Sequence, residues 1–436
     1  MFPAFFSSYK LNAFKALTSW LQIGAINLEA IDKNEVMHEA FKTLSNPGES
    51  PNVYEAAADC VIALLIRLED HDKTPFMSAL ELSVFTTVRR LHEPYELCVA
   101  HEALDKASNL CRVFTELAET FLVKMVNLDP RTPHFAITIL DNLLTCCGHP
   151  DYEIPDITFN FWYRLSEELY QKNDDDLNNI FRPFIERLIT CLCRHCQMEP
   201  DLDGLLEEGE DFAEFRNRVT ELIKDVVFVV GSANVFKHMF AFLQSSSGQW
   251  ESSEAALYIM SAVARNLFPE ENENVPQVLD VVLNSTGQHL AVRHTSVKLV
   301  GELGDWINHH PDYLQSILNW LLYGLQEPKL ASQAANSLTN ICSQCQRQMT
   351  QHFSPLVHIL NSLDSFKLKP NAAQGLVKGA SLLINNMSHD QVHNCMKTLT
   401  DLQLAPISIL LDKANQNGKV CLHLLNESKQ DFTIFC

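Results

Sequence analysis

The chain has 436 residues, of which 46% are hydrophobic, and a formal net charge of −21. It is too long for one ordinary globular core, yet no linker divides it into domains. The charge argues against nucleic acid and anionic membranes as direct partners, and it favours basic proteins or basic peptide tails.

Glycine is scarce, with 14 residues, and no run of alternating apolar and polar positions is long enough to indicate a sheet. A leucine-rich, helix-periodic sequence of this kind predicts an all-α protein. The longest uninterrupted apolar runs fall far short of the ~20 residues that a membrane span needs.

One pattern recurs along the chain, with apolar or small residues at positions i, i+3, i+4, i+7, i+8 and i+11. We call each copy a template helix, and the first is predicted over 11–26. The copies begin at Phe14, Val53, Leu110, Ile154, Phe212, Ser252, Val292, Ala331 and Ala372. The last four starts are separated by 40, 39 and 41 residues. Further amphipathic helices are predicted between the copies, for example over 314–325 and 353–363.

A helix pair that repeats every ~40–47 residues is typical of HEAT or armadillo arrays. The sequence therefore predicts a HEAT-repeat superhelical solenoid of about nine helical hairpins over residues 1–416. Alanine or glycine at i+3 and i+4 lets neighbouring helices approach closely. Residues 417–436 do not continue the pattern, and we expect a disordered tail there. Because neither end has a polar capping repeat, we expect an array that is incomplete at both ends and belongs to a longer one.

An acidic segment, residues 198–214, lies in the long step between Ile154 and Phe212 and contains no Lys or Arg. Its carboxylates are Glu199, Asp201, Asp203, Glu207, Glu208, Glu210, Asp211 and Glu214. So many carboxylates repel one another and cannot be buried unpaired. We expect an exposed, mobile insertion. The candidate residues for binding a basic partner are Glu207, Glu208, Glu210, Asp211 and Glu214.

Cysteine and histidine gather at Cys191-Leu-Cys193-Arg-His195-Cys196. Zinc accepts both ligand types, but a structural site needs four ligands, and the next cysteine pair (342 and 345) lies about four repeats away. Small apolar core cysteines are therefore favoured over a metal site. No Gly-rich phosphate loop, HExxH, GxSxG or kinase set occurs. We expect no catalytic residues, no cofactor, no metal and no enzyme activity.

Three other groups have both a structural and a functional interpretation. The aromatic residues of 159–163 could form a ligand platform, but their helical spacing favours the core. Arg293 and Lys298 flank the Val292 helix and could reach a ligand, although packing between repeats is favoured. His309 and His310 are expected in a solvated turn.

Several long blocks resemble the transportin-SR family of nuclear import receptors, within the importin-beta superfamily. Two of them are ELCVAHEALDKASNLCRVFTELAETFL (96–122) and AVRHTSVKLVGELGDWINHHP (291–311), and others cover 148–170, 211–232 and 330–345. The resemblance implies a HEAT solenoid that carries Arg/Ser-rich splicing factors and other basic cargo through nuclear pores. It further implies contacts with nucleoporins, release of cargo on Ran-GTP binding, and shuttling between cytoplasm and nucleus. The resemblance covers the central portion of such a receptor.

A HEAT-repeat scaffold of another class, such as a regulatory subunit of a phosphatase or kinase assembly, would be built from the same repeats. The residues alone leave this alternative open. Binding to Ran-GTP and Arg/Ser-rich proteins, compared with binding to phosphatase catalytic subunits, would separate the two.

Overall fold

The computed structural model describes residues 2–69, 74–127, 134–207, 209–246, 248–284, 287–366 and 368–417. Over these residues the chain is helical and contains no β-strand, which confirms the predicted all-α class. The predicted 1–416 array divides into two compact units. They are Met1–His195 with Gly209–Val230, and Cys196–Glu208 with Gly231–Cys436. Except for Asn417, the expected tail over 417–436 lies outside the described residues.

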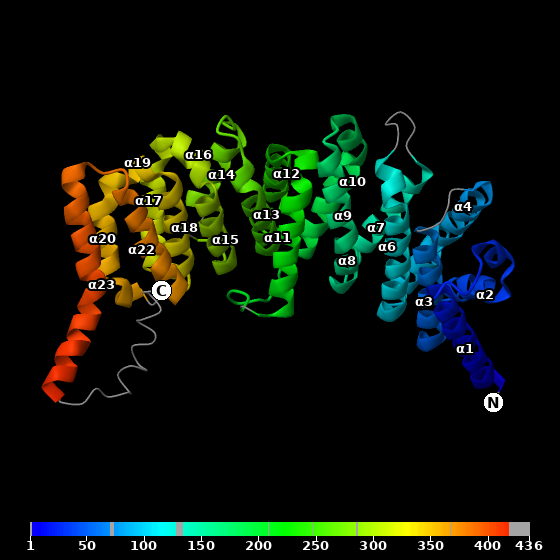
Figure 1. Ribbon diagram of the computed structural model, residues 1–436. Helices are drawn as coiled ribbons and strands as arrows, with labels where there is room; N and C mark the ends of the chain where they lie inside the picture. Colours follow the sequence, from blue (N-terminus) through cyan, green and yellow to red (C-terminus); the bar gives the residue numbers. More distant parts are fainter. Residues whose placement is uncertain are drawn as a thin grey trace. The chain divides into compact units, whose positions relative to one another are not determined.

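The first unit consists of two layers of helices (Figure 1). Its α-helices and 3-10 helices (η) are α1 (Phe2–Gln22), η1 (Leu28–Lys33), α2 (Glu35–Leu44), α3 (Pro51–Glu69), α4 (Pro75–Arg89), α5 (His92–Ala100), α6 (Leu104–Val126), η2 (Phe135–Thr138), α7 (Ile139–Cys147), α8 (Glu153–Ile157), α9 (Phe159–Lys172), α10 (Asp175–His195) and α11 (Asp211–Val230). The template helices pack in sequence order, α1 on α3, α3 on α6, α6 on α8 and α9, and α9 on α11. In the other layer α2 packs on α3, α5 and α7 pack on α6, and α10 packs on α7 and α11.

The second unit repeats this arrangement. Its elements are α12 (Ser232–Ser245), α13 (Trp250–Val263), η3 (Ala264–Asn266), α14 (Asn274–Leu283), α15 (Leu290–Glu302), α16 (Gly304–His309), η4 (Pro311–Tyr313), α17 (Leu314–Leu325), α18 (Ala331–Gln344), α19 (Gln346–Met349), η5 (Thr350–His352), α20 (Phe353–Asn361), α21 (Leu363–Phe366), α22 (Pro370–Ile384) and α23 (His389–Asn417). Template helices α13, α15, α18 and α22 pack in sequence order (Figure 1). In the other layer α12 packs on α13, α17 on α18, and α20 on α22.

In the second unit, the helix starts predicted from the template spacing agree with the observed ones. Helices α13, α15, α18 and α22 begin within two residues of the predicted starts, and α17 spans the predicted 314–325. The first helix differs, because α1 covers Phe2–Gln22 rather than 11–26. Gly24 ends it with φ +71°. The Ala25 N–H donates to the Trp20 carbonyl at 2.9 Å, which is the hydrogen bond of a left-handed helix cap.

Small residues let template helices touch without side chains between them. A Cβ placed on Gly301 of α15 would lie 2.6 Å from Oγ and 2.8 Å from Cα of Ser337 on α18. The Ser337 hydroxyl donates to the Val297 carbonyl at 2.7 Å. Gly379 of α22 has the same relation to Cys342, with 3.2 Å between its ideal Cβ and the cysteine Cβ. The close approach predicted from the small residues is therefore confirmed at these interfaces.

No single helix among the described residues is both long and apolar enough to cross a membrane. Helices α11 and α12 pass that test only as a pair, and the chain breaks between them at Gly231.

Candidate partner-binding surface

The first half of the acidic segment is docked on the second unit. Met198 is buried, and the Trp250 indole N–H donates to the Pro200 carbonyl at 3.3 Å. His289 Nδ1 accepts from the Ala291 N–H at 3.2 Å, so its Nε2 carries the proton that is donated to the Leu202 carbonyl at 3.1 Å. The Trp250 and His289 rings stack with centroids 3.7 Å apart. The structure therefore differs from the free insertion that was expected, since apolar and backbone contacts hold residues 198–202.

The carboxylates of this segment nevertheless point into solvent. Those that the structure describes as exposed are Glu199, Asp201, Asp203, Glu207, Glu210, Asp211 and Glu214. Glu208 lies outside the described residues. Asp211 and Glu214 occupy the first turn of α11, where the helix dipole stabilises negative charge without any partner. Exposure is thus established for the four described candidates, and their binding role stays a prediction.

A larger acidic surface lies on the template helices of the first unit. On α3, α6, α9 and α11 the exposed and half-buried positions follow one another every three or four residues, so each helix displays one stripe. We call the four stripes the acidic face. Its carboxylates are Glu55, Asp59, Glu69, Glu116, Glu119, Glu167, Glu214, Glu221 and Asp225, and its cations are Arg112, Arg164, Arg218 and Lys224. Nine carboxylates against three guanidinium groups and one ammonium group leave this face negative.

The arginines of the acidic face form ion pairs within the first unit. Arg112 pairs with Asp59 at 2.7 Å, which joins α6 to α3. Arg164 pairs with Glu119 at 2.6 Å and lies 3.7 Å from Glu69, so one guanidinium group bridges α9, α6 and α3. Arg218 binds both oxygens of Asp156 in α8, at 3.0 and 3.1 Å. These arginine pairs align neighbouring helices, and the remaining cation, Lys224, pairs with Glu221 on α11 at 2.8 Å.

Two carboxylates of the face have raised pKa values. Burial, together with the carboxylates of Glu119 and Glu69 and against the opposing charge of Arg164, raises the pKa of Glu116 to about 7. Burial, together with Glu221, also raises the pKa of Asp225. A cation brought to this face would stabilise the ionised form of both groups.

This face was not predicted from the sequence because its carboxylates come from four helices. A usable signal exists in α6 and α11, where acidic residues recur on the helix side opposite the small-residue template. Only Glu214 belongs both to the acidic face and to the acidic segment.

The cysteines serve as core residues. No disulfide bond joins the described cysteines, and no group of three or more His, Cys, Asp or Glu side chains in the described ranges could hold a metal ion. Cys193 and Cys196 are buried, and His195 Nε2 donates to the Cys147 carbonyl at 2.8 Å. Burial raises the pKa of the Cys342 and Cys345 thiols to about 12, which keeps them protonated and unreactive.

The aromatic residues of α9 also belong mainly to the core. The buried ones are Phe159, Phe161 and Trp162, while Tyr163 is half-buried. The Trp162 indole N–H donates to the Thr158 hydroxyl at 3.2 Å. The favoured interpretation as core is therefore confirmed for three of the four aromatic residues.

Arg293 and Lys298 pack between repeats, as favoured. Arg293 pairs with Glu327, and the Lys298 ammonium lies 4.4 Å from the centroid of the Tyr258 ring. His309 is exposed but belongs to the last turn of α16, and His310 lies in the expected connection but is half-buried rather than solvated. Its ring stacks on Trp306 with centroids 3.8 Å apart, and its Nδ1 donates to the Trp306 carbonyl at 2.9 Å.

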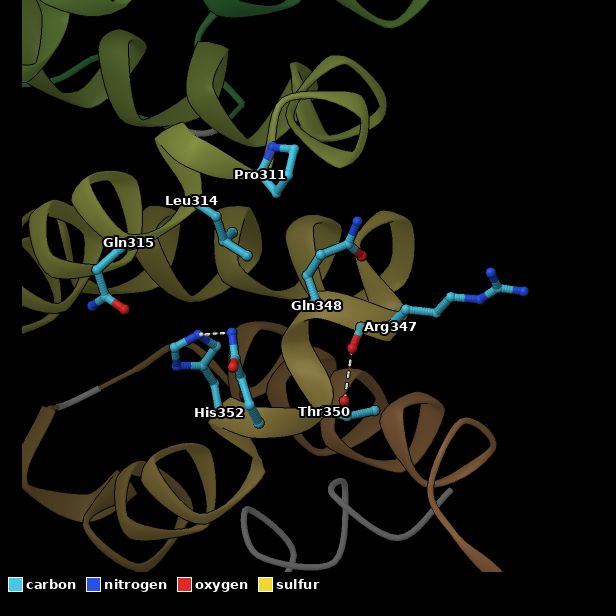
Figure 2. Close-up of a pocket in the computed structure, with 8 residues that line it drawn as sticks. Pro311, Leu314, Gln315, Arg347, Gln348, Thr350 and His352 are labelled. Carbon is cyan, nitrogen blue, oxygen red and sulfur yellow. Dashed lines mark hydrogen bonds between the residues drawn. The ribbon is translucent and has the colours of Figure 1, made fainter.

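A small polar cavity of about 210 Å³ lies where the turn before α17 meets the turn before α20 (Figure 2). The Thr350 hydroxyl donates to the Arg347 carbonyl at 2.7 Å, and Gln351 lies 3.3 Å from the His352 ring nitrogen. In Figure 2 the Arg347 side chain extends away from His352. The lining residues therefore do not converge on a common point, and this cavity does not define a functional site.

Two family descriptions match parts of the chain. The Transportin-3/Importin-13 second TPR domain matches residues 102–195, and the third TPR domain of the same family matches residues 272–359. A tetratricopeptide repeat has 34 residues, whereas the last template starts are 39–41 residues apart. The repeat length thus agrees with HEAT repeats.

Several curated proteins are similar over nearly the whole chain. The mRNA transport regulator MTR10 of Saccharomyces cerevisiae is 23% identical over 428 residues, which cover 92% of this chain and 42% of MTR10. Transportin MOS14 of Arabidopsis thaliana is 22% identical over 438 residues (92% and 44%), and Importin-13 of Homo sapiens is 18% identical over 450 residues (99% and 46%). The chain therefore spans less than half the length of these relatives.

Solved structures share the fold. A structure described as the cytosolic state of Importin13 superposes with a TM-score of 0.70 at 15% identity, over 98% of this chain and 55% of that one. A crystal structure of Kap121p gives a TM-score of 0.56 at 15% identity, over 99% and 44%. These neighbours are karyopherin HEAT-repeat solenoids, which confirms the predicted fold class. The relatives are named as a transport regulator, a transportin and an importin, and together these matches make the chain similar to karyopherins of the importin-beta superfamily.

Proposed function

We propose that this chain is the central part of a nuclear import receptor and binds basic cargo on the acidic face of α3, α6, α9 and α11. One observation carries the proposal: nine carboxylates share this face with three arginines and one lysine, and each of these cations is paired within the unit. Positive charge from a partner would neutralise the carboxylates of such a face. The relatives described above are karyopherins, which favours a receptor over a phosphatase or kinase scaffold.

The cargo class proposed within this function is the Arg/Ser-rich splicing factor, as in the transportin-SR family. Arginine side chains suit carboxylates because the guanidinium group donates two parallel hydrogen bonds. Phosphorylation adds nearly two negative charges to each serine, so this acidic face would repel a phosphorylated tail. The unphosphorylated form is therefore the proposed ligand of this face.

The wider transport cycle also belongs to the proposal. We infer release of cargo by Ran-GTP, contacts with nucleoporins, and shuttling between cytoplasm and nucleus. Structures of Kap121p, whose fold this chain shares, hold Nup53p in one case and Pho4p in another. The acidic segment, through Glu207, Glu210, Asp211 and Glu214, would supply further negative charge near the start of α11.

Titration of a fluorescent Arg/Ser peptide, followed by anisotropy, tests the proposal. The variant combines Glu55→Gln, Glu167→Gln and Asp225→Asn, three exposed carboxylates of the acidic face. The matched control combines Glu270→Gln, Glu273→Gln and Asp280→Asn, which are exposed in the second unit.

We expect the face variant to bind the peptide about fivefold to tenfold more weakly, since each exposed pair contributes about 0.2–1 kcal/mol. Its affinity should also depend less steeply on salt. The control should bind like the unmodified chain. Equal affinities for the two variants would remove the acidic face from cargo binding.

A further inference from the structure

Large apolar side chains are exposed on the acidic face. Ile66 of α3 is 48% exposed, Val123 of α6 50%, Tyr170 of α9 73% and Phe228 of α11 37%. We call these four residues the apolar row. Each of them lies in the last turns of its helix.

Contacts between the helices bring these helix ends together. The Tyr170 and Phe228 rings meet edge to face with centroids 5.7 Å apart. The Thr120 hydroxyl donates to the Leu65 carbonyl at 3.3 Å, which ties α6 to α3 one residue before Ile66. Two of the four apolar side chains therefore touch, and the other two lie at the ends of neighbouring packed helices, so the four differ from isolated exposed residues, which would need no explanation.

Every member of the row has a carboxylate one helical turn away. The pairs, on α3, α6, α9 and α11 in turn, are Ile66 with Glu69, Val123 with Glu119, Tyr170 with Glu167, and Phe228 with Asp225. Residues three or four apart share one side of a helix. Each of the four helices thus presents the same combination of an apolar surface beside a negative charge.

We propose that the apolar row binds one extended partner segment in which every third residue is large and apolar and the residues between include Lys or Arg. This proposal rests on the proposed function and narrows its cargo, because an Arg/Ser-only tail would satisfy the carboxylates and leave the row uncovered. Packed helices lie about 8–10 Å apart, and a polyproline II segment advances about 3.1 Å per residue with three residues per turn, so every third side chain points the same way. One apolar residue in every three, over about ten residues, matches four helices.

The net charge of the chain favours a basic segment, rather than a second copy of the chain, as the occupant of the apolar row. Each copy carries a net charge of −21, so two acidic faces would repel one another. A basic segment removes the row from water and at the same time neutralises the carboxylates beside it.

Two 12-residue peptides with equal numbers of arginines test the proposal. One has phenylalanine at every third position, and the other has serine there. The chain variant is Tyr170→Ser with Phe228→Ser. The matched control is Phe268→Ser with Tyr323→Ser, which removes two aromatic residues that are 74% and 62% exposed in the second unit. Circular dichroism checks that both variants are folded.

We expect the unmodified chain and the control to bind the phenylalanine peptide at least about tenfold more tightly than the serine peptide. The row variant should lose this preference and bind the serine peptide as before. A row variant that keeps the preference would overturn the proposal, as would an unmodified chain without any preference; the proposed function would survive both results if the serine peptide still binds. Failure of both peptides to bind would overturn the two proposals together.

Discussion

Replacing Gly301 by alanine tests the packing that joins the repeats. The added methyl group would lie 2.8 Å from Cα of Ser337, a backbone atom of α18 that cannot rotate away. Ordinary contact begins at about 3.4 Å, so α15 and α18 must separate by roughly 0.6 Å. The Ser337 hydroxyl, which donates to the Val297 carbonyl at 2.7 Å, lies in the path of the methyl group.

The expected loss of stability follows from three effects. Overpacking of this kind costs about 1–3 kcal/mol, and the loss of one hydrogen bond costs about 1 kcal/mol. The higher helix propensity of alanine returns about 1 kcal/mol. We therefore expect Gly301→Ala to destabilise the interface between α15 and α18 by about 1–3 kcal/mol.

Hydrogen exchange followed by mass spectrometry measures this loss locally. Peptides from α15 and α18 should exchange about tenfold faster or more, since each 1.4 kcal/mol corresponds to a factor of ten. Gly324→Ala is the matched control, because its Cβ would lie 3.4 Å from the Ala334 Cβ and fits without movement. Exchange in Gly301→Ala that is no faster than in the unmodified chain would refute the close-packing argument.

Three further outcomes are expected. The pKa of Glu116 is about 7 in the folded chain and 4.5 in the unfolded chain, so the folded chain holds the carboxyl proton more tightly. The stability that this proton contributes is complete below pH 4.5 and is lost as pH rises through 7. Glu116→Gln should therefore raise the free energy of unfolding in urea at pH 8 by about 1–2 kcal/mol, after discounting for solvent screening, and change it little at pH 4; an equal gain at both pH values would contradict this. Combining Glu207→Gln, Glu210→Gln and Asp211→Asn should weaken binding of a basic peptide and flatten its salt dependence, and an unchanged affinity would exclude the acidic segment from the function. The thiols of Cys342 and Cys345 should resist alkylation at pH 8 until urea unfolds the chain, and rapid labelling of the folded protein would show that they are accessible.

The sequence was sufficient to predict repeats because local composition encodes them. Small residues on a 39–41 residue step located α13, α15, α18 and α22, since each such face must pack on the next one. The acidic face was not predictable in the same way. Its key contact joins Glu69, Glu119 and Arg164, and their meeting depends on how α3, α6 and α9 are aligned along their axes.

The docking of the acidic segment escaped prediction for a related reason. Composition correctly indicated exposed carboxylates. The contacts that hold the backbone, however, come from Trp250 and His289, which lie about 50 and 87 residues further along the chain. Stacking of His310 on Trp306 was missed because a histidine pair in a turn gives no sign of the ring that covers it.

Site-specific photo-crosslinking tests the central claim most directly. A benzophenone side chain in place of Glu167 on α9, with an equivalent chain carrying it in place of Glu273, would be irradiated with a labelled Arg/Ser peptide. We predict strong crosslinking from position 167, suppressed by high salt, and little from position 273. Equal crosslinking from the two positions, or none from position 167 under conditions in which the peptide binds, would contradict cargo binding on the acidic face.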